Sequence, residues 1–158
     1  MKRKDILNLN AALNECLELD GNIKFRYGIM RNRDAISKEI NILKQIEEEN
    51  RKIIKDFDEE RNVLILKYGK ELKNGTVQIA VNDENFPKYE KELKPLAEKY
   101  KEELKKYDES MKEYVDKILD EDIDTIPAFF MINVDNIPDS ITNGALNMLM
   151  TNGIIKDY

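Results

Sequence analysis

The chain has 158 residues, of which 41% are hydrophobic and 37% charged, and its formal net charge is −6. It contains no histidine and no tryptophan, and Cys16 is its only cysteine. These totals exclude histidine-dependent catalysis, histidine metal sites and an internal disulfide, and the length fits a single domain, 1–158. A lone cysteine predicts a reducing compartment.

Membrane insertion is not expected from the hydrophobic pattern. No run approaches the roughly 20 apolar residues that a helix needs to span a bilayer. The basic start, MKRK, is not followed by an uninterrupted apolar segment, so it does not predict a signal peptide. We therefore expect a soluble, cytoplasmic protein with no membrane partner.

Residues 5–20 are predicted to form a short amphipathic helix. Apolar residues recur there in steps of three and four, at Ile6, Leu9, Leu13, Cys16 and Leu17. Gly21 and Asn22 then supply a stop signal. Cys16 lies within this apolar series and is predicted to be a small core residue, because nothing nearby would lower its pKa.

Residues 23–33, IKFRYGIMRNR, carry four basic side chains: Lys24, Arg26, Arg31 and Arg33. Ile23, Phe25, Tyr27 and Ile29 alternate with polar positions as in a strand, although Phe25 and Ile29 also fit one helical face. We favour a short extended entry and a helix that begins between Tyr27 and Arg31. Rings and cations would then point in opposite directions, which disfavours nucleic-acid binding and leaves the four cations as candidate protein contacts.

Residues 28–69 are predicted to form one long helix, because neither proline nor glycine occurs between Gly28 and Gly69. One heptad series holds Ile36, Leu43, Asn50, Phe57 and Leu64, and the second holds Ile40, Glu47, Ile54, Arg61 and Tyr68. Residues 87–119 repeat the pattern and contain Pro95, which predicts either a kink or the start of the main helix.

These two segments are predicted to fold back on each other as a long antiparallel, coiled-coil-like helical hairpin. Counting back from the connection places Phe57 near Tyr100, and Arg61 near Glu92 and Glu98. The insert, 70–86, contains the turn signal Asn74-Gly75 before an alternating segment. Either a small β-hairpin or a loop fits that segment.

The tail, 120–158, is predicted to mix strand and helix. Alternation over 128–134 indicates a strand, for which residues 22–27 are a candidate partner, and Thr142 or Asn143 is a candidate helix cap. Asp120, Asp122 and Asp124 have the spacing of the first ligands in a calcium loop. Thr125 and Met131 stand where that loop needs glycine and glutamate, so we predict an acidic loop and no metal site.

No catalytic motif is present in the sequence. Glycine-rich phosphate loops are missing, and the acidic clusters 47–49 and 58–60 fit solvated helix faces better than a catalytic pair. We therefore predict a non-enzymatic protein with no cofactor. The series Tyr100, Tyr107 and Tyr114 fits either a coiled-coil seam or a partner-binding face. If the tyrosine series forms a binding face, that face is covered by residues 5–20, by a second copy of the chain in a homo-oligomer, or by a foreign protein.

The arrangement resembles small helical-hairpin proteins of tailed phages and prophages. The resemblance lies in KFRYGIMRN at the entry of a long charged hairpin and in IPAFFMINVDNIPDSI in the tail. It implies a viral protein in a bacterial cytoplasm that binds a host or phage protein and inhibits a defence or nucleic-acid-handling protein. A structural or assembly role in the phage particle is the alternative. The acidic net charge predicts partners with basic surfaces.

Overall fold

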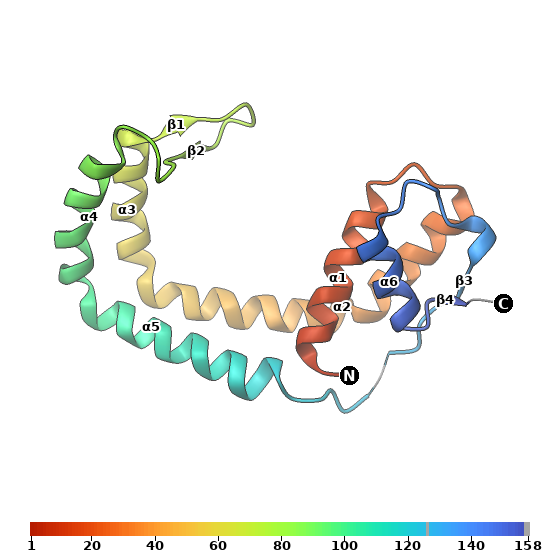
Figure 1. The fold of residues 1–158 in the computed structure, drawn as a ribbon. Helices are drawn as coiled ribbons and strands as arrows, with labels where there is room; N and C mark the ends of the chain where they lie inside the picture. Colours follow the sequence, from red (N-terminus) through yellow and green to blue (C-terminus); the bar gives the residue numbers. More distant parts are fainter. Residues whose placement is uncertain (126, 157–158) are drawn as a thin grey trace. The chain divides into compact units, whose positions relative to one another are not determined.

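The computed structural model describes residues 1–125 and 127–156 and is mainly helical, as the sequence predicts (Figure 1). Its contacts define two compact units. The terminal unit comprises Met1–Ile46 and the chain from Glu113 onward, and the middle unit comprises Glu47–Lys112. That both belong to a single domain stays a prediction. Of the predicted tail, Ile126, Asp157 and Tyr158 lie outside the described residues.

The described residues of the terminal unit form the α-helices α1 (Arg3–Leu17), α2 (Ile23–Arg51) and α6 (Asn143–Thr151). The helix α2 continues beyond Ile46 into the middle unit. Shorter elements are the π-helical turn η2 (Tyr114–Leu119), the strand β3 (Ile132–Asn133), the 3₁₀ turn η3 (Val134–Asn136) and the strand β4 (Ile155–Lys156). The predicted cap of α6 is confirmed, since the Thr142 hydroxyl accepts a hydrogen bond from the Ala145 N–H.

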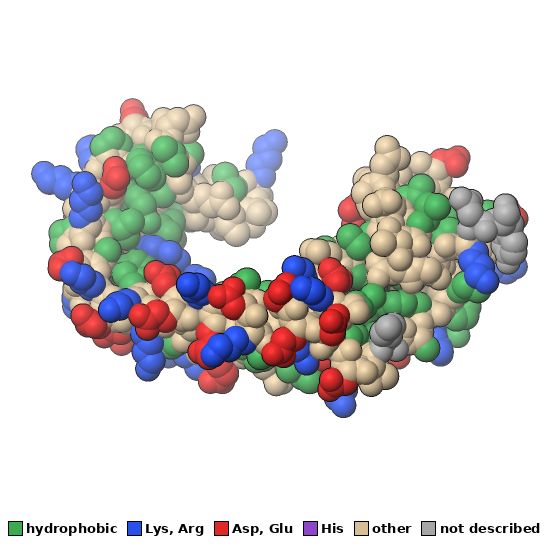
Figure 2. Space-filling model, turned by 60° about the horizontal axis from the view of Figure 1, so that its bottom comes forward, with side chains coloured by type: hydrophobic (Ala, Val, Ile, Leu, Met, Phe, Trp, Pro, Cys, Tyr) green, Lys and Arg blue, Asp and Glu red, His purple; other side chains and the backbone are tan. Residues whose placement is uncertain are grey.

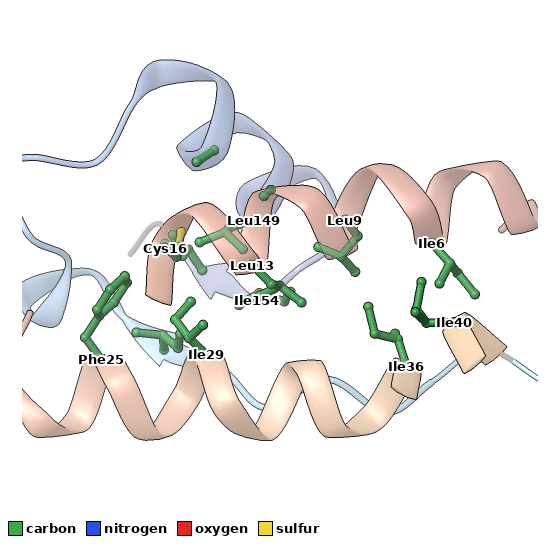
Figure 3. Packing of buried hydrophobic residues seen from close by; sticks show 14 residues of the cluster. Ile6, Leu9, Leu13, Cys16, Phe25, Ile29, Ile36, Ile40, Leu149 and Ile154 are labelled. Carbon is green, nitrogen blue, oxygen red and sulfur yellow. The ribbon is translucent and has the colours of Figure 1, made fainter. Parts of the chain in front are cut away.

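The core of the terminal unit lies where α1, α2 and α6 meet (Figure 3). The helix α1 contributes the apolar series predicted from its spacing, including Leu9, Leu13 and Cys16, which are fully buried. Phe25 and Ile29 enter from α2 and Leu149 from α6. Figure 1 shows α1 and α6 side by side, and the two helices contact each other within the core.

The predicted extended entry at 23–27 is wrong, because α2 begins at Ile23. The Asn22 side-chain oxygen accepts a hydrogen bond from the Phe25 N–H at 2.9 Å, which caps the first turn. Phe25 and Ile29, four residues apart, are both buried against the core. The cap and this contact together favour the helical periodicity over the strand alternation.

The predicted strand at 128–134 is reduced to Ile132–Asn133, and it pairs in parallel with Ile155–Lys156 instead of with 22–27. The segment before it is held by a side chain of α2. The Asn32 amide nitrogen donates to the Phe130 carbonyl oxygen at 2.9 Å, and the Phe130 N–H donates to Asn32 Oδ1 at 2.7 Å. Because Asn32 satisfies both backbone groups of Phe130, that residue needs no strand partner.

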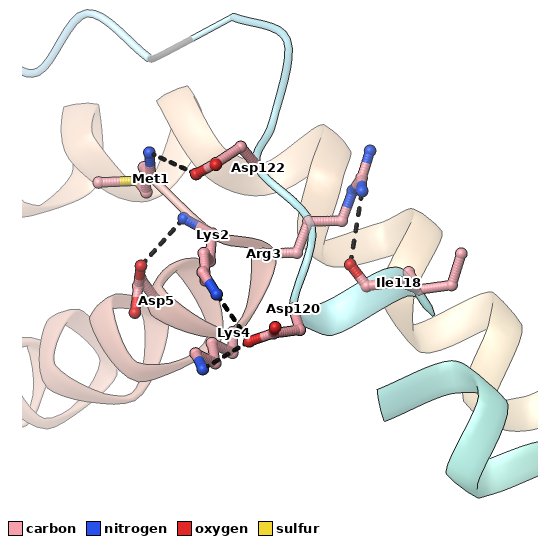
Figure 4. Close-up of polar contacts among 8 residues, drawn as sticks. All are labelled: Met1, Lys2, Arg3, Lys4, Asp5, Ile118, Asp120 and Asp122. Carbon is pink, nitrogen blue, oxygen red and sulfur yellow. Dashed lines mark hydrogen bonds and ion pairs between the residues drawn. The ribbon is translucent and has the colours of Figure 1, made fainter. Parts of the chain in front are cut away.

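The acidic loop after η2 binds the N-terminus of the chain (Figure 4). Asp120 accepts from the ammonium groups of Lys2 and Lys4 at 2.9 and 2.8 Å, and Asp122 lies 3.3 Å from the N-terminal amine. Arg3 pairs with Glu39 at 2.8 Å and with Glu121 at 3.3 Å. The basic N-terminal cluster is therefore neutralised locally, within what we call the N-terminal clasp.

The long helix predicted over 28–69 is present as an uninterrupted helical stretch from Ile23 to Tyr68, which contains one 3₁₀ turn. After α2, the 3₁₀ turn η1 (Lys52–Ile54) separates it from α3 (Lys55–Tyr68). Two short strands follow, β1 (Lys70–Glu71) and β2 (Val77–Gln78), and they form the small antiparallel hairpin around Gly75. The second helical stretch consists of α4 (Phe86–Lys99) and α5 (Lys101–Glu113). Pro95 lies inside α4, so it does not begin the main helix.

Contacts between α3 and α4 define the interior of the middle unit. The rings of Phe57 and Tyr100 meet edge to face, with centroids 6.0 Å apart, as the heptad count predicts. Lys67 pairs with Glu92 at 3.2 Å, and Glu60 pairs with Lys99 at 3.0 Å.

The predicted partners of Arg61, Glu92 and Glu98, were wrong. The guanidinium of Arg61 instead pairs with Asp58, three residues earlier on the same helix, at 3.0 Å. It also lies over the Phe57 ring, 5.5 Å from the centroid.

Candidate protein-binding surface

The four basic residues singled out in the sequence, Lys24, Arg26, Arg31 and Arg33, lie on the first three turns of α2. All four are exposed. Among the described residues none of them forms an ion pair, in contrast to Lys2, Arg3 and Lys4, which the N-terminal clasp neutralises. These four charges are therefore free to attract an anionic group.

An exposed apolar ridge runs between the four cations. Ile23, Tyr27 and Met30 are 74%, 52% and 61% exposed. Their spacing of four and three residues aligns them on one face of α2, opposite the buried Phe25 and Ile29. We call these three residues the α2 ridge.

The cations flank this ridge on both sides because of the helical spacing. Lys24 and Arg31 are seven residues apart and share one flank, and Arg26 and Arg33 share the other by the same rule. Many protein interfaces have an apolar centre and a polar border and are enriched in aromatic residues, methionine and arginine. The α2 ridge and its flanks therefore form the candidate binding surface.

Phe130 and Met131, from the tail, extend this surface on the flank that carries Lys24. The Phe130 ring meets Tyr27 edge to face, with centroids 5.5 Å apart, and both Phe130 and Met131 are exposed. A groove of about 310 Å³ opens here, lined by Lys24, Tyr27, Phe130, Met131 and Asn133 among others. Gly28 permits the close approach, since a Cβ there would lie 2.5 Å from Ile132 Cγ1.

Sequence reasoning found the cations but missed the apolar residues between them. The alternating pattern predicts rings and charges on opposite faces, whereas the helix buries Phe25 and leaves Tyr27 exposed beside Lys24 and Arg31. The spacing of Ile23, Tyr27 and Met30 was the available signal. Phe130 could not be found in this way, because 98 residues separate it from Asn32, which holds it.

The predicted tyrosine series is mostly enclosed. Tyr100 is half-buried, and its ring packs edge to face against Phe57. Tyr107 is half-buried, and Tyr114 is buried within the terminal unit. A role for these three rings in partner binding stays a prediction.

The only cysteine offers no nucleophile at neutral pH. Burial raises the pKa of the Cys16 thiol to about 11, with a further contribution from Glu15. Over residues 1–125 and 127–156, no group of three or more His, Cys, Asp or Glu side chains is placed to hold a metal ion. No helix in the same ranges combines the length and apolar character needed to cross a membrane.

Comparison with protein-family models, curated proteins and solved structures gives no match for this chain.

Proposed function

We propose that the protein acts without catalysis, by binding another protein through the α2 ridge and its four flanking cations. The observation that carries the proposal is the exposure of Ile23, Tyr27 and Met30 along one helical face between cations that have no described ion-pair partner. Burying such side chains against a partner removes apolar area from water, which gains about 25 cal/mol per Å² before the costs of association.

The charge at this surface favours an acidic partner. The net charge of the whole chain, −6, predicts basic partners, but the residues that would touch a partner here are positive. Opposite charge at the border speeds association and fixes orientation, and exposed charges more than about 8 Å apart are largely screened at physiological salt. The partner is therefore a protein with an apolar patch bordered by aspartate or glutamate.

The proposal also includes the predicted helical hairpin as the scaffold of the protein. The heptads predict an antiparallel, coiled-coil-like pairing of the stretches 28–69 and 87–119, and the Phe57–Tyr100 and Lys67–Glu92 contacts support it. The resemblance to tailed-phage and prophage proteins suggests that the partner is a host or phage protein in the bacterial cytoplasm. Binding would inhibit a host protein if it covers a surface that the host protein needs for its own activity.

The test compares the wild-type chain with three full-length variants for binding to acidic bacterial proteins. One variant combines Ile23→Ser, Tyr27→Ser and Met30→Ser, and a second combines Arg26→Glu with Arg31→Glu. The matched control combines Lys38→Glu with Lys44→Glu, which changes two exposed cations further along α2. Circular dichroism establishes that each form is folded.

We expect a partner captured by the wild type to bind the control with similar affinity and to bind both ridge variants at least tenfold more weakly. Biolayer interferometry at two salt concentrations measures this, and the Arg26–Arg31 variant should lose the salt dependence. Equal affinity of all forms would refute the proposal. A ridge-dependent shift of DNA or RNA with no protein partner would replace it with nucleic-acid binding.

A further inference from the structure

A second surface with its own chemistry lies in the middle unit, between α3 and α4. A groove of about 680 Å³ opens there, and its apolar walls come from Val63, Leu64, Pro95 and Leu96. Figure 2 shows hydrophobic side chains gathered over these two helices, with cationic side chains beside them. Val63 is 64% exposed, so the described residues leave much of this apolar wall in water.

The charges around this groove do not cancel. Its two carboxylates are already paired, Glu60 with Lys99 and Glu92 with Lys67. Hydrogen bonding to Lys99 lowers the pKa of Glu60, and hydrogen bonding to Tyr68 and then Lys67 lowers the pKa of Glu92, so both carboxylates stay ionised at neutral pH.

The groove also carries two cations that lack such partners. Lys88 and Lys91 line it one helical turn apart, and both are exposed. Neither forms an ion pair among the described residues. The uncompensated charge of the groove is therefore positive.

We propose that this groove binds an amphipathic helix that carries carboxylates, presented by another protein. Its apolar side chains, three and four residues apart, would enter between Val63 and Leu96, and its carboxylates would meet Lys88 and Lys91. Two packed helices with an exposed apolar groove are the usual receptor for such a ligand, since a third helix completes the burial of the apolar faces.

This inference goes beyond the proposed function, because it assigns a second docking surface built from different residues in a different unit. A chain with one docking surface in each unit can hold two proteins at once. Loss of either site by mutation should leave the other intact, which separates the two proposals experimentally.

The experiment uses the full chain and two labelled amphipathic peptides of about 18 residues, about 27 Å long as helices. Both peptides carry the same leucine stripe, flanked by glutamate in one and by lysine in the other. Fluorescence anisotropy measures their dissociation constants for the wild type, for Val63→Ser and for the double variant Lys88→Glu, Lys91→Glu. The matched control is Lys105→Glu with Lys106→Glu, which reverses two exposed cations of α5.

We expect the glutamate-flanked peptide to bind the wild type at least tenfold more tightly than the lysine-flanked peptide. The Lys88–Lys91 variant should reverse this preference, Val63→Ser should weaken both peptides, and the control and the α2 ridge variants should match the wild type. Dissociation constants that do not change when Lys88 and Lys91 are replaced would overturn the inference. A concentration-dependent dimer that Val63→Ser abolishes would also overturn it, because the groove would then be covered by a second copy.

Discussion

The two hydrogen bonds between Asn32 and Phe130 permit a quantitative prediction. Asn32 is 0% exposed, and Asn32→Ala removes both bonds and leaves the Phe130 N–H and carbonyl without their partner. Each bond contributes about 0.5–1.5 kcal/mol net, and a buried polar group left unpaired costs about 1–3 kcal/mol. Because the Phe130 backbone is only partly buried, water can reach it after the change. We therefore expect a loss of about 2 kcal/mol in the free energy of unfolding.

Urea denaturation followed by circular dichroism measures the loss, and hydrogen exchange locates it. The Phe130 amide should exchange faster in Asn32→Ala, since its acceptor has gone, while core amides of α1 change only through the global term. Asn41→Ala is the control, because Asn41 is an exposed asparagine of the same helix and its replacement should stay within about 0.5 kcal/mol. If Asn32→Ala behaved like this control and the Phe130 exchange rate did not change, the assignment of Asn32 as the anchor of the tail segment would be refuted.

Three further measurements test other parts of the terminal unit. Hydrogen bonds from Lys4 and Lys2 lower the pKa of Asp120 to about 2, so the clasp should stabilise the fold fully above pH 4 and lose its effect as the pH falls through 2. Unfolding curves of wild type and Asp120→Asn should therefore differ at pH 6 and converge below pH 2, and a constant difference would contradict the assignment. Phe25→Ala should cost about 3–5 kcal/mol in the same assay, because it empties a fully buried site, and an effect below 1 kcal/mol would be inconsistent with that packing. Cys16 should resist Ellman's reagent at pH 8 until urea unfolds the chain, since its pKa is raised to about 11, and immediate labelling would show that the thiol is accessible.

The sequence predicts best those elements whose apolar spacing fits only one kind of secondary structure. The apolar steps of α1 identify its buried face, including Cys16, because no alternating reading fits them. The heptads place Phe57 opposite Tyr100 by counting alone. The Thr142 cap is also predictable, because a hydroxyl before an apolar turn has a specific local acceptor role.

The predictions that are wrong concern segments whose local sequence pattern favours one structure and whose long-range contacts favour another. Residues 23–29 satisfy both a strand and a helix pattern, and the decision depends on the buried partners of Phe25 and Ile29, which come from α1 and the tail. The strand at 128–134 is lost for a related reason. Asn32 takes both hydrogen bonds of Phe130, and only Ile132–Asn133 remains to pair with Ile155–Lys156. The sequence of the tail alone gives no sign that Phe130 will hydrogen-bond to Asn32, 98 residues earlier in the chain.

The same competition explains why the candidate surface was hidden in the sequence. In a strand, Phe25 and Tyr27 would share a face, so both would be buried or both exposed. In the helix they are separated by about 200°, so Phe25 is buried and Tyr27 remains exposed with Ile23 and Met30. The apolar ridge exists only because the segment is helical. A proline at position 27, which would disrupt the first turns of α2, should therefore abolish partner binding by destroying the ridge itself, with all four cations still present in the chain.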